Sequence, residues 1–515
     1  MLTRIKNAFR KANDITASVL AGIARRYPHA AKFLGIVRSR RRPLFVIFFL
    51  VMHIIGFFMS IQAVMQTRTA QGAVAWAISL NTIPVIAVPS WMVFGDSRID
   101  SYTTVHRAGL EKVRPLARSF LKNIESAEAA RSTEEPTMAA AAKFASLPPL
   151  QGNKAELLID GKATFDSIFE AIDKAEKYIL VQFYILRNDG TGVELRDRLA
   201  AKVAEGVRVF VLLDDLGCLD LGKTYVKELR DAGVDARFFM DFSGEANRFQ
   251  LNFRNHRKLV VVDGRKVFIG GLNVGDEYLG KHPTMTPWRD THVALTGPIA
   301  KAAQISFVED WHWATEDLIP DLDWDLTKED VAGSVAAIVL PSGPADPIET
   351  CSMFFLSAIN NAKKRVWIAT PYFVPDDKIV TALQMAALRG VEVKILIPEN
   401  TDSRLVQLSS YSYLEPLETT GVEIYRYTEG FMHQKVIMVD DALSAIGSAN
   451  FDNRSFRLNF ELTAVIHDEK FAGEVATMLE NDFSNSRPAK SSELKERSFI
   501  FKLSVRLARL LAPIQ

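Results

Sequence analysis

Cysteine is nearly absent from this chain, since Cys218 and Cys351 are the only two among 515 residues. Two thiols cannot form a disulfide framework or a structural zinc site, so we expect free thiols in a reducing compartment. A surplus of charge is also missing, because 62 basic residues balance 61 acidic residues and leave a net charge of +1. That balance gives no global field that would attract nucleic acid. A chain of this length can form two or three domains with a large core.

Acidic residues are almost missing from the first 42 positions, which contain eleven Lys and Arg and one acid, Asp14. This composition predicts a basic segment 1–42 beside a membrane, with an organelle transit peptide as the alternative. A nearly uninterrupted apolar run follows from Pro43 to about Met65. About 22 helical residues, at roughly 1.5 Å per residue, cross a hydrocarbon core. The run is too long, and its leader too extended, for a cleaved signal peptide.

A second, weaker apolar stretch runs from Ala73 to Gly95 and contains Pro84 and Pro89. A kinked membrane helix tolerates proline, so we predict a two-helix transmembrane hairpin over 43–95; the alternative is a buried helix of a soluble domain. Arg38 to Arg42 flank the first helix, whereas the connecting loop offers only Arg68. Positive residues favour the cytoplasmic side, so the N-terminus and everything after Gly95 are expected there.

The C-terminal segment 488–515 has apolar residues at helical spacing with basic residues between them. The apolar positions are Phe499, Leu503, Leu507, Leu510 and Ile514. This pattern predicts a basic amphipathic helix that lies either on anionic lipid or on its own domain, and the sequence does not choose between these.

One short pattern occurs twice: His256-Arg-Lys258 with Asp263, and His433-Gln-Lys435 with Asp440. A His can attack phosphorus or donate a proton, and a Lys two positions along a strand lies on the same face and can neutralise a phosphate. Each motif continues through an apolar run into a small-residue turn that ends in Asn. These turns are Gly270-Gly271-Leu-Asn273 and Gly447-Ser448-Ala-Asn450. A single H-x-K is usually a surface loop, but its repetition points to catalysis.

The repeat extends beyond the motifs, and the two histidines lie 177 residues apart. That spacing indicates a duplicated domain rather than a solenoid unit. Helix-like segments precede strand-like segments in both copies, which predicts an α/β fold with a mostly parallel sheet covered on both faces. We expect a linker over 96–145, one domain over 146–330 and its copy over 331–487. A pseudo-two-fold axis between the copies would bring both histidines to one phosphate.

These residues resemble the phospholipase D superfamily, whose active site consists of two H-x-K-x4-D motifs. Further segments resemble the bacterial cardiolipin synthases within that superfamily, and together they cover most of the chain after about residue 145. Gln182, Met432 and the long basic leader depart from the usual pattern. The matching segments are Asn252-Phe-Arg-Asn255, Trp288-Arg289-Asp290, Gly297-Pro298, Thr370 to Pro375, Phe451 to Phe456, and Asn459-Phe460-Glu461.

The resemblance implies that one His forms a phosphohistidine and that the other acts as general acid and base. By analogy we assign the attack to His256 and the proton transfers to His433. Lys258 and Lys435 are expected to hold the phosphate oxygens, and Asn273 and Asn450 to donate further hydrogen bonds. The hydroxyl of Ser448 is expected either to reach the phosphate or to cap a turn.

Four acidic residues belong to the predicted site. Asp290 and Glu461 are the carboxylates we favour for fixing the tautomers of the catalytic histidines. Asp263 and Asp440 complete the two motifs, and the resemblance suggests a mainly structural role for both. Tyr184 and Tyr372 end equivalent strands and either line the headgroup site or belong to the core. The remaining histidines show no metal-ligand spacing, so neither a metal nor a cofactor is expected.

The predicted function is that of a cardiolipin synthase, which transfers a phosphatidyl group from one phosphatidylglycerol to another and releases glycerol. The alternatives are a hydrolytic phospholipase D and another phosphatidyltransferase or phosphodiesterase of the superfamily. Phosphatidylglycerol and cardiolipin in the membrane are the expected partners, and nucleic acid is not. The expected location is the bacterial inner membrane, with multiple spans and the catalytic domains in the cytoplasm.

Overall fold

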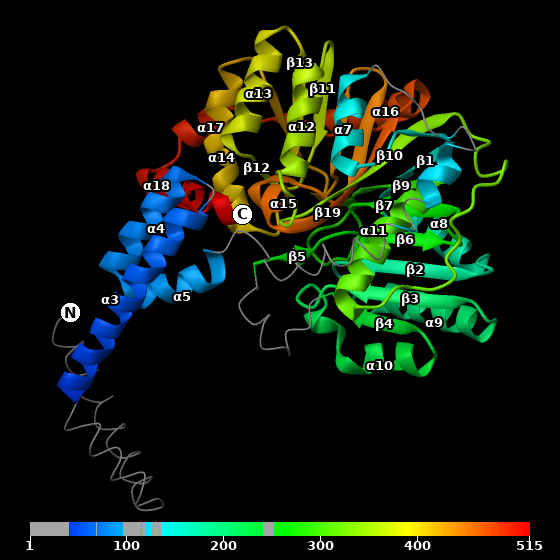
Figure 1. The fold of residues 1–515 in the computed structure, drawn as a ribbon. Coiled ribbons are helices and arrows are strands. Elements are labelled where there is room, and N and C mark those ends of the chain that lie inside the picture. The colour runs from blue at the N-terminus through cyan, green and yellow to red at the C-terminus, as the bar shows by residue number, and fades with distance from the viewer. Residues whose placement is uncertain are drawn as a thin grey trace, which may run out of the picture. The chain divides into compact units, whose positions relative to one another are not determined.

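A computed structural model describes residues 41–67, 69–95, 115, 119–125, 129, 135–239 and 252–515. The chain forms two compact units, one ending at Ser97 and one beginning at Arg98 (Figure 1). The predicted basic segment 1–42 lies almost wholly outside the described residues, as does much of the predicted linker 96–145. Both therefore stay predictions.

The N-terminal unit contains one helix among the described residues that is long and apolar enough to cross a membrane. It is α3 (Arg41–Gln66), and its apolar part is Phe45–Gln66. Large apolar side chains of α3 are exposed, including Phe45 at 63% and Phe58 at 65%. Exposure of this extent distinguishes α3 from the buried core helix of a soluble protein.

The second apolar stretch, predicted as a kinked helix over 73–95, is interrupted. This stretch forms two short helices, α4 (Ala70–Thr82) and α5 (Pro84–Phe94). The break falls at Ile83, whose φ of −133° and ψ of 56° are not helical. Proline lacks an N–H group and excludes the preceding residue from the helical region, so Pro84 starts a new helix instead of continuing α4. The two-helix transmembrane hairpin therefore stays a prediction.

The three helices of this unit pack closely on one another. A Cβ atom at Gly56 of α3 would lie 2.2 Å from the main-chain oxygen of Leu80 in α4, so only glycine permits this approach. Trp76 and Trp91 meet edge to face, with ring centroids 5.1 Å apart. The apolar segments therefore form a small bundle of their own.

The catalytic unit is built on one continuous sheet that contains strands from both copies of the repeat (Figure 1). Its order is β20-β14-β13-β11-β16-β17-β19-β10-β1-β9-β7-β6-β2-β3-β4. The first copy supplies β1 (Leu150–Ile159), β2 (Tyr178–Phe183), β3 (Arg208–Leu213), β4 (Asp235–Phe238), β6 (Leu259–Val262), β7 (Lys266–Gly270) and β9 (Thr291–Thr296). The second supplies β10 (Val335–Ser342), β11 (Arg365–Ala369), β13 (Glu392–Pro398), β14 (Glu423–Tyr427), β16 (Val436–Val439), β17 (Leu443–Gly447), β19 (Asn459–His467) and β20 (Ser486–Pro488).

The strand order reads the same outward from both sides of the central pair β1 and β10, apart from the extra edge strand β20. These two strands are antiparallel, with Leu150 opposite Ala337. An antiparallel pair at the centre of a palindromic order relates its flanks by a local two-fold rotation. The sheet therefore supports the predicted pseudo-two-fold relation between the copies.

The expectation of a mostly parallel sheet is wrong. Along the strand order given above, only β2, β3 and β4, with their counterparts β11, β13 and β14, pair in parallel, and the other neighbours are antiparallel. The cause is the short turn that begins at Asp263 and returns β6 directly into β7. A turn of this length joins antiparallel strands, whereas parallel strands need a long crossover. The second copy repeats the turn at Asp440.

Helices cover both faces of the sheet, as predicted. Along β2, Tyr178 and Leu180 join a central core shared by both copies, while Ile179 and Val181 join the outer core of the first copy. This alternation is the period of two expected for a strand buried on both faces. The helices of the first copy are α8 (Asp160–Asp173), α9 (Gly190–Ala204), α10 (Lys223–Asp231) and α11 (Pro298–Thr315). Those of the second are α12 (Thr350–Asn361), α13 (Asp377–Leu388), α14 (Arg404–Glu418), α15 (Asn453–Arg457) and α16 (Glu469–Ser484).

Part of the predicted linker is an integral element of the fold. Residues Pro136–Ala145 form α7, which is capped by the carboxylate of Glu135. Met138 and Ala141 of this helix are buried in the outer core of the second copy. The linker therefore ends before α7, and the domain limits 146–330 and 331–487 stay predictions.

Candidate active site

Each H-x-K motif is tied by its main chain to the opposite copy of the repeat. The short strand β5 (Arg254–Asn255), just before His256, pairs with the start of β19 in the second copy. The amide of His256 donates to the oxygen of Phe460 at 2.9 Å. In the reciprocal arrangement, β15 (Phe431–Met432) pairs with β8 (Trp288–Arg289) in the first copy, and the amide of His433 donates to the oxygen of Arg289 at 2.7 Å.

This crossing places His256 against Glu461, the residue that follows Phe460. His256 Nδ1 lies 3.0 and 2.9 Å from the two carboxylate oxygens. Because an ionised carboxylate can only accept, Nδ1 carries the proton and Nε2 is left unprotonated for chemistry. Ser455 and Asn459 also donate to Glu461, at 2.8 and 3.1 Å. Glu461 is fully buried and held from several sides.

His433 has the equivalent partner from the first copy, because its Nδ1 lies 2.8 Å from Asp290 Oδ2. Asp290 is fully buried and also accepts from the amide of Thr291 at 2.8 Å. A Cβ atom at Gly271 would lie 2.0 Å from Asp290 Oδ1, so this glycine makes room for the carboxylate. The sequence predicted both orienting carboxylates, but its residue order gives no signal that they cross between the copies.

Ser448 supports Glu461, and its predicted contact with the phosphate stays a prediction. Its hydroxyl donates to Glu461 Oε2 at 2.5 Å and accepts from the amide of Leu462 at 2.9 Å. Both bonds hold the carboxylate that faces His256.

The two lysines occupy matching positions beside their histidines. Lys258 Nζ donates to the main-chain oxygen of His256 at 2.6 Å, and Lys435 Nζ donates to that of His433. Lys435 Nζ also lies 2.7 Å from His433 Nδ1. Both lysine side chains are buried, and each is influenced by the charges of Asp290 and Glu461. The two motifs thus share one electrostatic environment.

Burial lowers the pKa of His256 to about 4, although the carboxylate of Glu461 acts in the opposite direction. Burial alone would raise the pKa of Glu461, but His256, Lys258 and Ser448 bring it below its ordinary value. Burial and the ammonium of Lys435 likewise lower the pKa of His433. At neutral pH the resting site therefore holds neutral imidazoles beside ionised carboxylates.

The two predicted asparagines differ in their side-chain hydrogen bonds. Asn273 Oδ1 accepts from the amide of Ile185 at 3.1 Å, and its Nδ2 donates to the hydroxyl of Tyr278 at 3.1 Å. Asn450 is buried, and its Oδ1 has no hydrogen-bond partner among the described residues. Asn273 therefore also holds its turn in place, whereas the side-chain oxygen of Asn450 is left unpaired within the described residues.

Asp263 and Asp440 lie at the far ends of β6 and β16, away from the histidines. Asp263 accepts from the amides of Glu176, Lys177 and Tyr178 at 2.7 to 2.9 Å. Asp440 accepts in the same way at 2.7 to 3.1 Å from the amides of the three residues that lead into β11, which are Lys363, Lys364 and Arg365. Both have positive φ angles, 54° and 55°. These contacts fit the structural role that the family resemblance implies.

Aromatic rings line both histidines. The rings of Tyr184 and His256 meet edge to face at 4.9 Å, and Lys258 Nζ lies 5.4 Å from the centre of the Tyr184 ring. Tyr372 lies 6.4 Å from His433, and its hydroxyl donates to Asp402 at 2.7 Å. Trp288 is 5.3 Å from His433. The site alternative for Tyr184 and Tyr372 is thus the one that the geometry favours.

The middle residue of each H-x-K motif anchors a buried network that the sequence did not reveal. Arg257 pairs with Asp310 of α11 at 2.7 Å, and Gln182 and Asn255 donate to the same carboxylate oxygen at 2.7 and 2.9 Å. In the second copy Gln434 donates to Asp482 of α16 at 3.0 Å. The available signal was the polar residue between His and Lys, which alternates to the opposite face of the strand.

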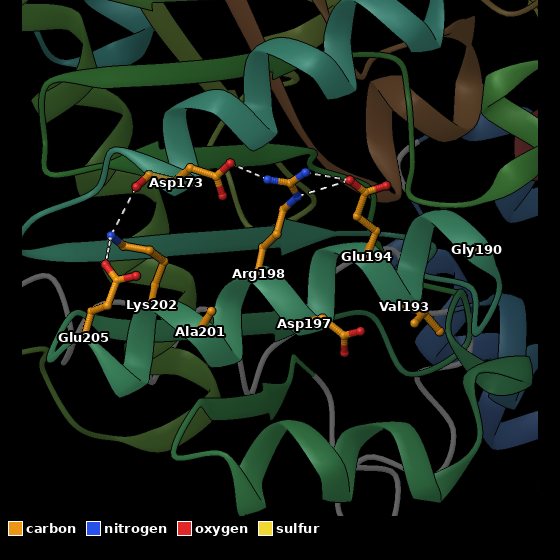
Figure 2. Close-up of a pocket in the computed structure, with 9 residues that line it drawn as sticks. All are labelled: Asp173, Gly190, Val193, Glu194, Asp197, Arg198, Ala201, Lys202 and Glu205. Carbon is orange, nitrogen blue, oxygen red and sulfur yellow. Dashed lines mark hydrogen bonds and ion pairs between the residues drawn. The ribbon is translucent and has the colours of Figure 1, made fainter.

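A surface pocket elsewhere on the first copy contains none of the predicted site residues. It is lined by the end of α8 and by α9 (Figure 2). Arg198 lies between Asp173 and Glu194, and Lys202 pairs with Glu205 at 2.5 Å. Both cations that line the pocket, Arg198 and Lys202, are already paired with carboxylates, so the lining presents no free cation to a phosphate.

The duplicated α/β fold with two H-x-K motifs and crossed carboxylates defines a phospholipase D-like enzyme. A family model described as "Cardiolipin synthase, PLD-like domain" matches residues 168–286 and 355–483. Cardiolipin synthase A of Pseudomonas fluorescens (strain SBW25) is 46% identical over 474 residues, which cover 92% of this chain and 98% of that protein. Cardiolipin synthase A of Pseudomonas putida (strain GB-1) is 46% identical over 467 residues, with coverages of 90% and 97%. The chain belongs to the cardiolipin synthases of the phospholipase D superfamily.

A solved structure shows the same fold at low sequence identity. The crystal structure of phosphatidylserine synthase from Haemophilus influenzae matches with a TM-score of 0.58 and 18% identity. The match covers 74% of this chain and all of that one. The common fold therefore extends over both copies of the repeat.

Proposed function

We propose that this chain makes cardiolipin from two molecules of phosphatidylglycerol by way of a phosphohistidine. His256 Nε2 attacks phosphorus and the bond from phosphorus to the glycerol oxygen breaks. His433, which takes up a proton at Nε2 when the anionic phosphate binds beside it, donates that proton to the departing glycerol. His433 then takes a proton from a hydroxyl of the second phosphatidylglycerol. That oxygen attacks phosphorus, and the bond between phosphorus and His256 breaks.

The crossed pairs of His256 with Glu461 and His433 with Asp290 are the observation that carries this proposal. Each carboxylate holds the Nδ1 proton of its histidine, which leaves both Nε2 atoms for the phosphate. As phosphorus becomes five-coordinate, negative charge grows on its non-bridging oxygens. The proposed hydrogen-bond donors to that charge are Lys258, Lys435 and the amides of Asn273 and Asn450. Such donors stabilise the charge most strongly in a buried site.

To distinguish transfer from hydrolysis, the full-length protein is incubated in detergent with labelled phosphatidylglycerol and the products are identified. We expect cardiolipin and free glycerol in equal amounts. If phosphatidic acid is the sole lipid product, the reaction is hydrolysis and the proposed transfer is wrong. His256→Ala and His433→Ala should each abolish turnover, whereas Arg198→Ala, at the surface pocket, should not.

The roles of the two histidines are tested with a phosphatidyl ester of p-nitrophenol, whose leaving group needs no proton. His433→Ala should release one equivalent of p-nitrophenol and retain the labelled phosphatidyl group. His256→Ala should give neither. A labelled His256→Ala protein and an unlabelled His433→Ala protein would reverse the assignment.

We also propose that the chain is a multi-pass protein of the bacterial inner membrane with its catalytic unit in the cytoplasm. Support comes from the apolar helix α3 and from the basic residues Arg38 to Arg42, which are matched in the connecting loop only by Arg68. In this proposal α4 and α5 cross the membrane together as a broken helix. Thiol labelling in intact cells tests it: Thr67→Cys should react with an impermeant reagent, and Ser97→Cys should react only after lysis. Reaction of both before lysis would exclude this topology.

A further inference from the structure

Helix α18 (Phe499–Leu510) docks on the catalytic unit through one face only. Its first turn is capped by Ser498, whose hydroxyl accepts from the amide of Phe501 at 3.3 Å. The ring of Phe501 meets Tyr411 of α14 edge to face at 5.4 Å. Val505 and Ala508 on the same face are buried. These contacts fix the orientation of the helix on the protein.

The face of α18 that does not dock carries a continuous apolar stripe. At about 100° per residue, positions 499, 500, 503, 507 and 510 fall within one sector of the helix. Their side chains are exposed although all are large and apolar. The exposed fractions are 77% for Phe499, 78% for Ile500, 45% for Leu503, 54% for Leu507 and 74% for Leu510.

The charged residues beside this stripe indicate what kind of partner covers it. Helix α18 contains no acidic residue, and Lys502, Arg506 and Arg509 lie on the flank between the docked and the apolar face. Arg509 stacks on Tyr413 at 5.4 Å, while Lys502 and Arg506 form no ion pair with any described residue. An apolar stripe bordered by cations fits the acyl and headgroup layers of an anionic membrane.

The end of this helix is attached to the turn that supports the catalytic Glu461. Beyond α18, the main-chain oxygen of Gln515 accepts from the amide of Arg454 at 2.7 Å. The Arg454 guanidinium donates to the oxygens of Ile514 and Asn252. Arg454 belongs to α15, and its neighbour Ser455 donates to Glu461 at 2.8 Å. A short chain of contacts therefore links α18 to Glu461, the partner of His256.

We propose that α18 lies in the surface of an anionic lipid bilayer and holds the α15 turn, and with it the active site, at the level of the lipid headgroups. Phe499, Ile500, Leu503, Leu507 and Leu510 enter the acyl region, and Lys502 and Arg506 bind lipid phosphates. The lipid contact is independent of whether the site transfers or hydrolyses, and the depth it sets for the site rests on the proposed lipid substrate.

Lipid quenching of a fluorescent probe tests the contact without reference to activity. Leu507→Cys in the full-length protein is labelled and reconstituted into vesicles of phosphatidylcholine and phosphatidylserine that contain a spin-labelled lipid. Leu388→Cys on α13 is the matched control, because Leu388 is also exposed, at 66%. The native Cys218 and Cys351 are buried, so the protein that carries only these two cysteines measures the background labelling.

We expect quenching at position 507 to exceed that at position 388 several-fold, and to weaken when Lys502 and Arg506 are both changed to Gln or when phosphatidylserine is omitted. Equal quenching at both positions would overturn the proposal. A blue-shifted but unquenched probe at 507 would also overturn it, because protein such as α3–α5 or a second copy would then cover the stripe. A well-quenched probe on a protein without synthase activity would separate this proposal from the proposed function.

A second measurement asks whether the contact serves catalysis. Leu503→Glu with Leu507→Glu should raise KM for substrate in vesicles about ten-fold while leaving kcat in detergent micelles unchanged. Leu219→Glu with Leu388→Glu, two exposed residues on other elements, should change neither. Loss of kcat in micelles would instead show that the stripe is needed for folding, and unchanged vesicle kinetics would separate α18 from substrate access.

Discussion

His256 and Glu461 are 205 residues apart in the chain, yet Nδ1 of the first lies 2.9 Å from the carboxylate of the second. The contact joins the two copies of the repeat, and His433 with Asp290 joins them in the opposite direction. Neither copy alone contains a histidine together with its orienting carboxylate. The site that these pairs form therefore requires both copies of the repeat.

Replacing Glu461 by Gln is expected to lower kcat by about 10² to 10⁴, because the amide no longer enforces the tautomer of His256. The change should leave KM for phosphatidylglycerol almost unaltered, since Glu461 does not contact substrate in the proposed reaction. Steady-state kinetics on mixed micelles measure both constants. Glu423→Gln, at an exposed position of β14, is the matched control. A fall in kcat of less than about three-fold would show that Glu461 does not orient the nucleophile.

Replacing Asp440 by Ala is expected to reduce stability far more than catalysis. Three amides at the start of β11 would lose their acceptor, at a cost of about 1 to 3 kcal/mol, and alanine tolerates the positive φ poorly. The thermal midpoint of unfolding in detergent should fall, while kcat of the protein that remains folded should stay within about three-fold of wild type. Asp441→Ala, at the neighbouring exposed position, should be nearly neutral. Full stability with lost turnover would instead make Asp440 a catalytic residue.

The alkaline side of the pH profile is expected to report Lys435. Burial lowers the pKa of this lysine to about 8, so the charged form needed to bind phosphate is lost as the pH rises through that value. Because kcat/KM reflects the free enzyme, it should fall above pH about 8. In Lys435→Arg the cation persists, so this alkaline limb should move upward even where the absolute rate is lower. An alkaline limb at the same pH in both proteins would assign it to another group.

The sequence predicts features that arise from local patterns better than features that depend on contacts between distant segments. The paired motifs, the duplication and the apolar segment are local patterns, and each corresponds to a feature of the fold or of the family. The antiparallel part of the sheet was missed although the cause, the turn at Asp263, lies within the motif itself. The pairing of His256 with Glu461 could not be read, because it depends on β5 meeting β19, a contact set by the tertiary structure. The break at Pro84 was readable from the general behaviour of proline.

The buried pair of Arg257 and Asp310 is expected to fix the segment between β5 and β6 that carries His256 and Lys258. Asp310 is fully buried and accepts from Arg257, Gln182 and Asn255, so Asp310→Leu would remove the carboxylate that is ion-paired with a buried cation. Breaking such a pair costs about 3 to 5 kcal/mol, whereas replacing both partners by apolar residues is often neutral.

Thermal unfolding in detergent should therefore show a large loss of stability for Asp310→Leu and a substantial recovery in the double variant Arg257→Met with Asp310→Leu. Recovery is expected to be incomplete, because Arg257 also donates to the main-chain oxygen of Glu461 at 3.1 Å. That same bond predicts a kinetic difference: the double variant should regain stability without regaining full kcat, since the carboxylate facing His256 loses one of its supports. Recovery of both together would mean that Arg257 acts on folding alone, and recovery of neither would mean that the ion pair does not fix this segment.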